Sequence, residues 1–404
     1  MKQSRVHTIV LKALAVCMVI VFVGYSGIAA RSAVSDCIHH GDVNLDARIT
    51  AADAQLAFFI TLGQYSPTYE EECAADCDGS GRVTSADAQL IFLTVLGTGA
   101  CEDPLGTPTP TLTPMPGDLV ATDPIVVNMR FVPAGSFTQG SPNTEPCRDN
   151  DEGPQFTHIL TRNLAVMETA VSRQMWADLK AVQGTLPADP SDTDFSPTMN
   201  HPVQQNIWNE SVLFANLLSL QNGFAQCYYT DAGYTIPVTD ENYMFEPIFC
   251  NFNADGYRLP TEGEWEYFAR AGTSGPFSCD ERYYNFDNCF TCEQGMLPTL
   301  EQYCVFCANS SWETAVVGSK LPNPWNLKDV HGNVFEWCWD WYVDSYPSGT
   351  VTDYVGPSFA SGRIYRGGSW DKYPMFTRSA FRGWNFPTHR SYGLGFRLVR
   401  TVSF

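Results

Sequence analysis

Two short acidic segments near the start of the chain have the residue types and spacing of a calcium-binding loop. In each segment, oxygen-bearing side chains stand at loop positions 1, 3, 5 and 12, and the same spacing returns 34 residues later. A hard cation such as Ca²⁺ takes six to eight oxygen ligands, and a loop of this kind wraps them around one ion. The expected ligands, with the backbone carbonyls of the two arginines, are Asp42, Asn44, Asp46, Arg48 and Asp53 in the first loop and Asp76, Asp78, Ser80, Arg82 and Asp87 in the second.

The two loops differ at position 6, which commonly needs a positive φ. The second loop has Gly81 there and the first has Ala47, and a left-handed conformation costs alanine roughly 1 kcal/mol. We therefore expect the first site to be the weaker one. A helix-like apolar run follows each loop, at 57–62 and 91–96, and the duplication argues against two chance polar turns. The unit resembles a type I dockerin, which implies a cohesin-type scaffold protein as partner of residues 36–103.

Four cysteines further along form two C-x-x-C pairs, Cys289 with Cys292 and Cys304 with Cys307. Four thiolates at such spacing form the tetrahedral site of a structural zinc ion. In an oxidising compartment the same cysteines form disulfides instead, so both alternatives are open. In either case the cysteines would clasp the loop around them. The count of cysteines is odd once the leader described below is removed, and Cys338, set among tryptophans, is the expected free thiol.

The composition indicates an exported protein with an ordinary hydrophobic core. The net charge is −20, which would repel a phosphate backbone and excludes nucleic acid as a partner. Lys2, Arg5 and Lys12 precede an apolar run over 13–30 that ends in small-residue cleavage sites. This pattern predicts a secretory signal peptide over 1–35, with an uncleaved membrane anchor as the alternative. We expect a secreted or cell-surface protein.

The remaining chain divides into two domains joined by a spacer. Residues 36–103 hold the duplicated loops, and residues 104–118 are rich in proline and threonine. Proline holds such a segment near the polyproline II conformation, so it acts as a semi-rigid linker. Residues 119–404 form the large domain.

Three motifs in the large domain carry a resemblance to a known family. They are RLPTEGEWEYFAR at 258–270, DVHGNVFEW at 329–337, and the segment 361–400 with its Gly-Gly-Ser-Trp, Arg-Ser-Ala and Gly-Phe-Arg sequences. Over 126–401 the chain resembles the formylglycine-generating enzymes, also called sulfatase-modifying factors. The resemblance implies an α+β class of fold, irregular and related to C-type lectins, beside a small α-helical, EF-hand-like dockerin domain.

Several segments of the large domain are expected to be purely structural. Ser172 is the expected N-cap of one helix, and residues 208–220 have the apolar content of a second, buried one. Thr261 and Glu264 form a capping box for a third helix that ends at Gly272.

The resemblance also implies a calcium site in the 329–337 motif, with several ligands contributed by backbone carbonyls. A hydrogen-bonded turn without metal is the alternative. A second calcium site of the family is not expected, because the loop that supplies its carboxylate is shortened near Glu313. The implied ligands are Asp329, Val330, Gly332, Val334 and Glu336.

The family's oxidases hold copper(I) between two cysteines that follow Gly-Gly-Ser, and one of these cysteines also bonds to the substrate. Thiolates are the ligands that Cu(I) selects. In this chain the first position falls at Lys372, the second is lost in a short deletion before Arg378, and no cysteine follows Cys338. We therefore do not expect copper.

Two functional interpretations remain. The first is a non-catalytic binding module, because fixed motifs alternate with aromatic and polar positions of the kind that adaptable binding surfaces use. The second is a formylglycine-generating oxidase with relocated ligands. For each aromatic residue, burial in the core is the simpler alternative. The candidate contacts for an unknown protein or glycan are Lys372, Tyr373, Phe376, Phe381, Trp384, Asn385, Phe386, His389 and Tyr392.

Overall fold

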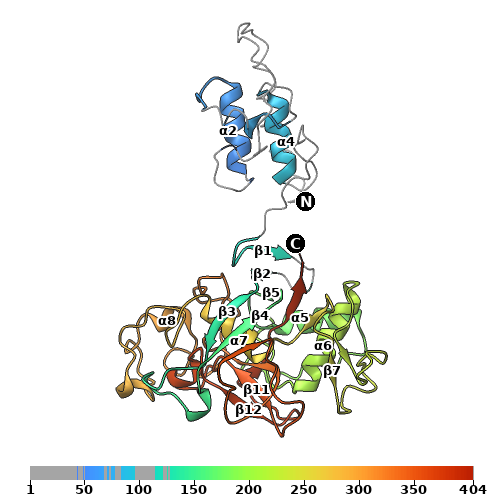
Figure 1. The fold of residues 1–404 in the computed structure, drawn as a ribbon, viewed down its shortest axis with the longest axis vertical. Coiled ribbons are helices and arrows are strands. Elements are labelled where there is room, and N and C mark those ends of the chain that lie inside the picture. The colour runs from blue at the N-terminus through green and yellow to red at the C-terminus, as the bar shows by residue number, and fades with distance from the viewer. Residues whose placement is uncertain are drawn as a thin grey trace. The chain divides into compact units, whose positions relative to one another are not determined.

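The chain forms two compact units, Met1–Leu112 and Thr113–Phe404, and the division falls within the predicted linker (Figure 1). The computed structural model describes Val43, Ile49, Glu71, Ile125 and the ranges 51–67, 74–77, 83–95, 114–121 and 128–403. The predicted leader over 1–35 and most of the linker lie outside these residues. Among the residues described, no helix is long and apolar enough to cross a membrane.

The described part of the first unit contains two helices, α2 (Ala51–Thr61) and α4 (Ser85–Val95), which pack against each other. Each helix begins at the end of one acidic loop and contains most of the apolar run expected there. Asp53 and Asp87 lie in the first turns of these helices, where the helix dipole favours a carboxylate. Among the described residues of this unit, the buried apolar side chains are mostly small: Val43, Ala54, Ala57, Ala74, Ala75, Cys77, Ala88 and Ile91.

The second unit contains a five-stranded antiparallel sheet in the order β1-β2-β5-β14-β8. The C-terminal strand β14 lies inside this sheet, between β5 and β8, so the end of the chain shares a sheet with the first strands of this unit. Figure 1 shows the red C-terminal strand beside the blue-green first strands. The strands are β1 (Leu119–Ala121), β2 (Met129–Val132), β5 (Asn163–Met167), β14 (Val399–Val402) and β8 (Tyr257–Arg258).

Three smaller sheets complete the strands of this unit. The sheet β12-β11-β9-β13 carries the C-terminal segment, and the others have the orders β10-β4-β3 and β6-β7. Their strands are β3 (Gly135–Gln139), β4 (Phe156–Leu160), β6 (Tyr228–Tyr229), β7 (Phe249–Cys250), β9 (Phe335–Trp341), β10 (Thr350–Thr352), β11 (Arg363–Arg366), β12 (Gly383–Asn385) and β13 (Leu394–Gly395). Most strands are short, which confirms the predicted irregular α+β fold.

The helices of the second unit begin where their capping residues predict. Ser172 Oγ accepts a hydrogen bond from Met175 N at 3.2 Å. Thr261 Oγ1 accepts from Glu264 N at 3.1 Å, and Glu264 Oε2 accepts from Thr261 N at 2.8 Å, which confirms the capping box. The helices are α5 (Arg173–Val182), α6 (Trp208–Gln221), α7 (Glu262–Arg270) and the short α8 (Leu300–Tyr303).

Helix α6 is buried over nearly its whole length, from Trp208 to Ser219. Because the helix is covered on all sides, its polar residues are buried too, and they have hydrogen-bond partners, as Asn216 Nδ2 has in the carbonyl oxygen of Tyr228 at 2.8 Å. It lies in the largest hydrophobic cluster, together with the aromatic residues of β9 and the end of the C-terminal segment. A second cluster packs around α7.

Candidate functional site

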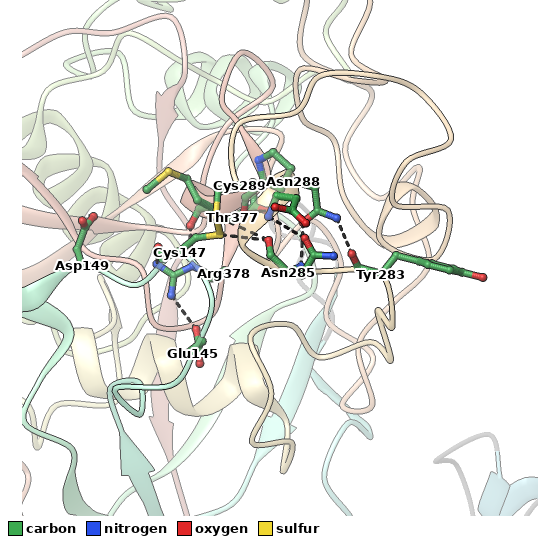
Figure 2. Close-up of a disulfide and its surroundings, with 12 residues drawn as sticks. Glu145, Cys147, Asp149, Tyr283, Asn285, Asn288, Cys289, Thr377 and Arg378 are labelled. Carbon is green, nitrogen blue, oxygen red and sulfur yellow. Dashed lines mark hydrogen bonds and ion pairs between the residues drawn. A yellow bond between two sulfur atoms is a disulfide. The ribbon is translucent and has the colours of Figure 1, made fainter.

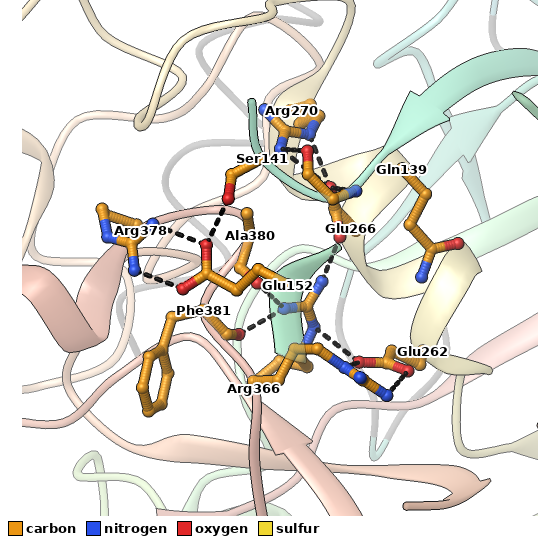
Figure 3. Close-up of polar contacts among 12 residues, drawn as sticks. Gln139, Ser141, Glu152, Glu262, Glu266, Arg270, Arg366, Arg378, Ala380 and Phe381 are labelled. Carbon is orange, nitrogen blue, oxygen red and sulfur yellow. Dashed lines mark hydrogen bonds and ion pairs between the residues drawn. The ribbon is translucent and has the colours of Figure 1, made fainter. Parts of the chain in front are cut away.

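Buried arginine–glutamate pairs hold the fixed positions of the C-terminal segment (Figure 3). Arg366 donates to Glu266 and, over 2.7 Å, to the carbonyl oxygen of Ala380. Arg382 Nε donates to Glu262 Oε1 at 2.6 Å. Burial alone would raise the pKa of Glu262, but the neighbouring Arg382 and Arg366 outweigh burial and lower it. Separating such pairs would leave an uncompensated buried charge, so they fix the segment in one conformation.

Arg378 joins the C-terminal segment to a distant disulfide (Figure 2). Its Nη1 donates to Glu145 Oε1 at 2.7 Å and to Glu152 Oε2 at 2.8 Å, and all three residues are buried. Its Nη2 donates to the carbonyl oxygen of Cys147 at 2.8 Å. Cys147 in turn forms a disulfide with Cys289. The fixed Arg-Ser-Ala position therefore anchors the C-x-x-C loop as well.

The C-x-x-C cysteines form disulfides in a pattern that the sequence did not predict. Cys147 pairs with Cys289, Cys292 pairs with Cys307, and Cys304 is a buried thiol. The four-thiolate zinc site is therefore wrong for this structure, because three of its four sulfurs are in disulfides. The predicted clasp is confirmed, since the second disulfide joins the two pairs, although Cys147 was not foreseen as a partner.

The position at which the family's oxidases have their first copper-binding cysteine holds a half-exposed lysine. Lys372 Nζ lies 2.7 Å from Asp371 Oδ2 and forms an ion pair with it. The carbonyl oxygen of Lys372 accepts a hydrogen bond from Cys307 N at 3.1 Å. A cysteine therefore lies directly beside this position, but its sulfur is bonded to Cys292.

Free thiols do occur elsewhere in the part of the chain that is described. Burial raises the pKa of each of them, to about 11 for Cys227 and about 12 for Cys279. A raised thiol pKa opposes formation of the thiolate that Cu(I) requires. Cys338 is free, as predicted, and the full set is Cys227, Cys250, Cys279, Cys304 and Cys338.

Four of the predicted contact residues have exposed aromatic side chains: Tyr373, Trp384, Phe386 and Tyr392. Phe381 was predicted wrongly as a contact, because it is buried in the main hydrophobic cluster and packs against Phe376 with 5.0 Å between ring centroids. An aromatic ring gains more from such burial than from exposure, and the sequence offers no means of distinguishing the two. Partly buried are Lys372, Phe376, Asn385 and His389.

The exposed aromatic residues form separate small clusters rather than one continuous patch. Trp384 stacks on Tyr342 with 5.2 Å between centroids and meets Phe386 edge-on at 6.4 Å. Tyr392 packs on Phe195 at 4.6 Å between centroids. Phe195 and Tyr342 are contacts that sequence reasoning missed, because both come from loops outside the C-terminal segment.

Tyr373 extends toward the C-x-x-C loop. Its ring meets that of Phe290 edge-on, with 5.6 Å between centroids. Phe290 lies inside the first C-x-x-C pair and was also missed as a surface residue. The C-x-x-C loop and the C-terminal segment are therefore neighbours at the lost copper position.

The acidic side chains predicted to bind calcium in the 329–337 motif, Asp329 and Glu336, are buried and accept hydrogen bonds, although Asp329 Oδ1 has no partner among the described residues. Asp329 Oδ2 accepts from Gly318 N at 2.6 Å, and burial raises the pKa of Asp329. Glu336 accepts from Trp265 Nε1 at 2.7 Å and from Arg397 Nη2 at 2.8 Å. Calcium at this motif stays a prediction, and it would require Glu336 to exchange these partners. The other implied ligands, also buried, are Val330, Gly332 and Val334.

In the dockerin-like unit, the structure describes three of the predicted calcium ligands. Asp53, Asp76 and Asp87 are buried, and Asp87 Oδ2 accepts from Thr84 N at 2.7 Å. Buried carboxylates in a small unit fit the donor set that a hard cation requires. Within the described ranges, no three His, Cys, Asp or Glu side chains are placed to hold a metal. Outside these ranges lie Asp42, Asn44, Asp46, Arg48, Asp78, Ser80 and Arg82.

Fold and site together define a class: a formylglycine-generating-enzyme-like domain that carries a dockerin unit and has an ion-paired lysine at the position of the oxidase cysteine. The chain belongs to the sulfatase-modifying factor enzyme 1-like domain family, whose model matches residues 118–402. Residues 40–95 match the dockerin type I domain. Both resemblances read from the sequence are confirmed.

Curated relatives include formylglycine-generating enzymes of bacteria. The chain is 29% identical to that of Streptomyces coelicolor, over 57% of this chain and 62% of the enzyme. It is 27% identical to that of Thermomonospora curvata, over 68% of this chain and 93% of the enzyme. The chain thus spans less than two thirds of the Streptomyces enzyme.

Two solved structures have the same fold with a TM-score of 0.55. One is Treponema denticola variable protein 1, with 29% identity, which covers 68% of this chain and 95% of that protein. The other is PvdO from Pseudomonas aeruginosa, with 25% identity, which covers 72% of this chain and 100% of that protein.

Proposed function

We propose that this chain is a secreted, non-catalytic binding protein on a sulfatase-modifying-factor scaffold, docked to a partner through its dockerin unit. One observation carries the proposal. At the position where an oxidase needs a thiolate, Lys372 forms an ion pair with Asp371, and the neighbouring Cys307 is sealed in a disulfide. An ammonium group has no lone pair for Cu(I), and its charge repels the ion.

The exposed aromatic side chains support a binding role. Trp384 and Phe386 are about half exposed. Trp384 lies on strand β12, which is held in place by pairing with β11, the strand that carries the buried Arg363. Rigid aromatic side chains on a fixed scaffold offer contact area at a small entropic cost. The likeness to a protein titled a variable protein favours the same interpretation.

The binding role can be tested before the ligand is identified. We would probe a glycan array with the labelled full chain and with a double variant, Trp384→Ala with Phe386→Ala. The matched control is Phe359→Ala, another exposed aromatic residue, whose ring packs at a tilt against Trp341 instead. Glycan signals that the double variant loses and the control keeps support the proposal for a glycan ligand. Signals that all three proteins share would contradict this surface as the binding site.

Calcium and a cohesin-type partner belong to the dockerin unit in this proposal. The family match over residues 40–95 favours both, because a dockerin domain implies a cohesin partner and its two loops carry the oxygen side chains that calcium takes. The predicted signal peptide favours secretion. The disulfides favour it as well, since bonds such as Cys147–Cys289 persist in oxidising compartments.

An oxidase with relocated ligands is the second candidate, and one contact favours it. Reduction of the Cys292–Cys307 disulfide would place a thiol beside Lys372, because Cys307 N already bonds to the Lys372 carbonyl. Competition with a Cu(I) chelator under reducing conditions tests this candidate. One tightly bound copper that Cys307→Ser removes would favour the oxidase, and binding that survives this substitution would not.

A further inference from the structure

The disulfide-bonded lobe, residues 277–307, has apolar side chains on two opposite sides. One set faces inward and forms a small hydrophobic cluster of its own, which includes Phe277, Tyr284, Leu297, Leu300 and Phe306. The other set faces solvent. Tyr283 is 61% exposed, Phe286 67%, Phe290 66% and Met296 46%. Figure 2 shows Tyr283 pointing away from the disulfide.

The outward set contributes little to the stability of the lobe. The inward cluster and the two disulfides already hold it together. Exposed aromatic and methionine side chains, by contrast, cost solubility, and they are enriched at protein–protein interfaces. Four such side chains between positions 283 and 296 of one loop therefore indicate a contact surface.

Local hydrogen bonds make this surface rigid before any partner binds. Asn285 Oδ1 accepts from Asp287 N at 2.7 Å, and Asn288 Oδ1 accepts from Asn285 N at 2.9 Å. Glu281 Oε2 accepts from Leu300 N at 2.8 Å, which ties the start of the lobe to α8. A pre-ordered surface loses little entropy on binding.

The surface continues into the C-terminal segment. Phe290 meets Tyr373 edge-on, and Cys307 N bonds to the carbonyl oxygen of Lys372. The lobe therefore contacts the proposed binding face at Lys372 and Tyr373.

The rim of the surface is acidic. Asp280, Asp287 and Glu293 are interspersed with the exposed aromatic residues and are themselves exposed. Arg282 is the single basic residue of the lobe, and its Nε is bonded to Asp280 Oδ2 at 3.0 Å. Such a field attracts a cationic partner and repels an anionic membrane or a phosphate backbone.

We propose that the outward face of the lobe, formed by Tyr283, Phe286, Phe290 and Met296 and extended by Tyr373, binds a basic polypeptide segment. The apolar side chains of the partner pack on the rings, and its lysines or arginines pair with the acidic rim or lie over the rings. This inference rests on the proposed function and deepens it, because Tyr373 is one of the proposed contact residues and the inference names a protein ligand for the surface that Tyr373 joins.

A defined peptide tests the inference with the full chain. The probe is a fluorescein-labelled 12-residue peptide of alternating lysine and leucine, and binding is followed by fluorescence anisotropy. The test variant is Phe286→Ser with Phe290→Ser, and the matched control is Phe359→Ser, an aromatic residue of similar exposure outside the lobe. We expect the lobe variant to bind about tenfold more weakly, as for loss of interface anchors. The control should change affinity less than about twofold.

Two further arms separate the apolar and ionic parts of the interaction. A peptide with glutamate in place of lysine should not bind, and Asp287→Asn with Glu293→Gln should weaken the lysine peptide and flatten its salt dependence. Equal binding by the lobe variant, or by the glutamate peptide, overturns the proposal. Self-association of the wild type that the lobe variant abolishes, seen in sedimentation velocity, would also overturn it in favour of a second copy. Peptide mapping confirms that both disulfides of the variants are intact.

These outcomes are distinct from failure of the proposed function. If the chain makes formylglycine and the lobe variant loses peptide binding, the lobe is supported as a binding surface and the non-catalytic assignment is wrong. If the lobe variant binds normally while no formylglycine forms, only the lobe surface is wrong.

Discussion

Cys307 N and Lys372 O lie 3.1 Å apart, so the C-x-x-C loop is hydrogen-bonded to the residue that occupies the expected copper position. This contact brings together two parts of the chain that the sequence suggested for different purposes. The sulfur of Cys307 is engaged with Cys292, and Lys372 is engaged with Asp371. As a result, no described thiolate is presented where the family's oxidases perform their chemistry.

The disulfide pattern gives a first prediction. Peptide mapping under non-reducing conditions should recover Cys147 linked to Cys289 and Cys292 linked to Cys307, because these pairs are already bonded in the folded chain. Cys304 should be alkylated only after unfolding, since it is buried. Four alkylatable thiols at the C-x-x-C positions with one zinc per chain would contradict the pattern.

Removal of a buried arginine should strongly reduce the stability of the large domain. Arg378→Met leaves Glu145 and Glu152 buried without their cation, which should lower the free energy of unfolding by about 3–5 kcal/mol. Arg282→Met is the matched control, because its ion pair with Asp280 is exposed, and it should change stability by less than about 0.5 kcal/mol. Urea titration measures both values, and similar losses in the two variants would contradict the role of Arg378.

Asp340 should make the stability depend on pH. Burial, and then the nearby Glu262, raise the pKa of Asp340 well above its ordinary value. A raised folded-state pKa means that this carboxyl favours the folded state fully below the unfolded pKa near 4, and this contribution is lost as pH rises toward the folded pKa.

Asp340→Asn removes this ionisation while keeping an acceptor for Glu262 N, which now bonds to Asp340 Oδ2 at 2.7 Å. The variant should therefore exceed the wild type in stability at pH 7 by roughly 1 kcal/mol or more, and the difference should shrink toward pH 4. Thermal unfolding at several pH values measures the difference. A variant that is less stable at every pH would show that Asp340 is charged and paired in the folded chain.

Core and surface aromatic residues should respond differently to truncation. Phe381→Ala removes a buried ring and should cost about 3–5 kcal/mol of stability. Trp384→Ala removes a ring that is 42% exposed and should cost no more than about 1 kcal/mol. Denaturant midpoints of the two variants check the contrast, and a large loss for Trp384→Ala would assign this ring to the core.

Calcium should stabilise the dockerin-like unit within the full chain. Chelation should lower the melting temperature of one calorimetric transition and leave that of the large domain nearly unchanged, because ligand binding stabilises only the unit that binds. Asp76→Ala should reduce this effect more than Asp42→Ala, since Gly81 makes the second loop the tighter site. Equal effects of the two substitutions would contradict the predicted difference between the loops.

The sequence predicted those parts of the fold that local chemistry determines. The capping pair Thr261 and Glu264 specifies the start of α7, and the apolar residues between Val212 and Leu220 predict a helix that packs in the core. The partner of Cys289 could not be predicted, because Cys147 lies 142 residues away along the chain and meets it through tertiary contacts, among them the hydrogen bond from Arg378 to the Cys147 carbonyl. Spacing along the chain carries no information about such contacts.

Which residues of the proposed binding face are exposed could not be predicted from the sequence either. Phe376, Phe381 and Phe386 look alike in the sequence, yet one is half-buried, one is core and one is exposed. Phe290 is exposed to solvent, whereas the preceding residue, Cys289, is buried and forms the disulfide with Cys147. Which aromatic residues meet solvent depends on loops that no periodic pattern describes.

The most direct test of the non-catalytic assignment is the conversion of cysteine to formylglycine. The purified full chain is incubated with copper, oxygen and a peptide of the Cys-x-Pro-x-Arg type, with the Thermomonospora curvata enzyme as positive control, and the peptide mass is followed. Because Lys372 supplies no thiolate at the first copper position, we predict no aldehyde product, with or without a thiol reductant that would free Cys307. Formylglycine above the level of a copper-only control would contradict the proposed function.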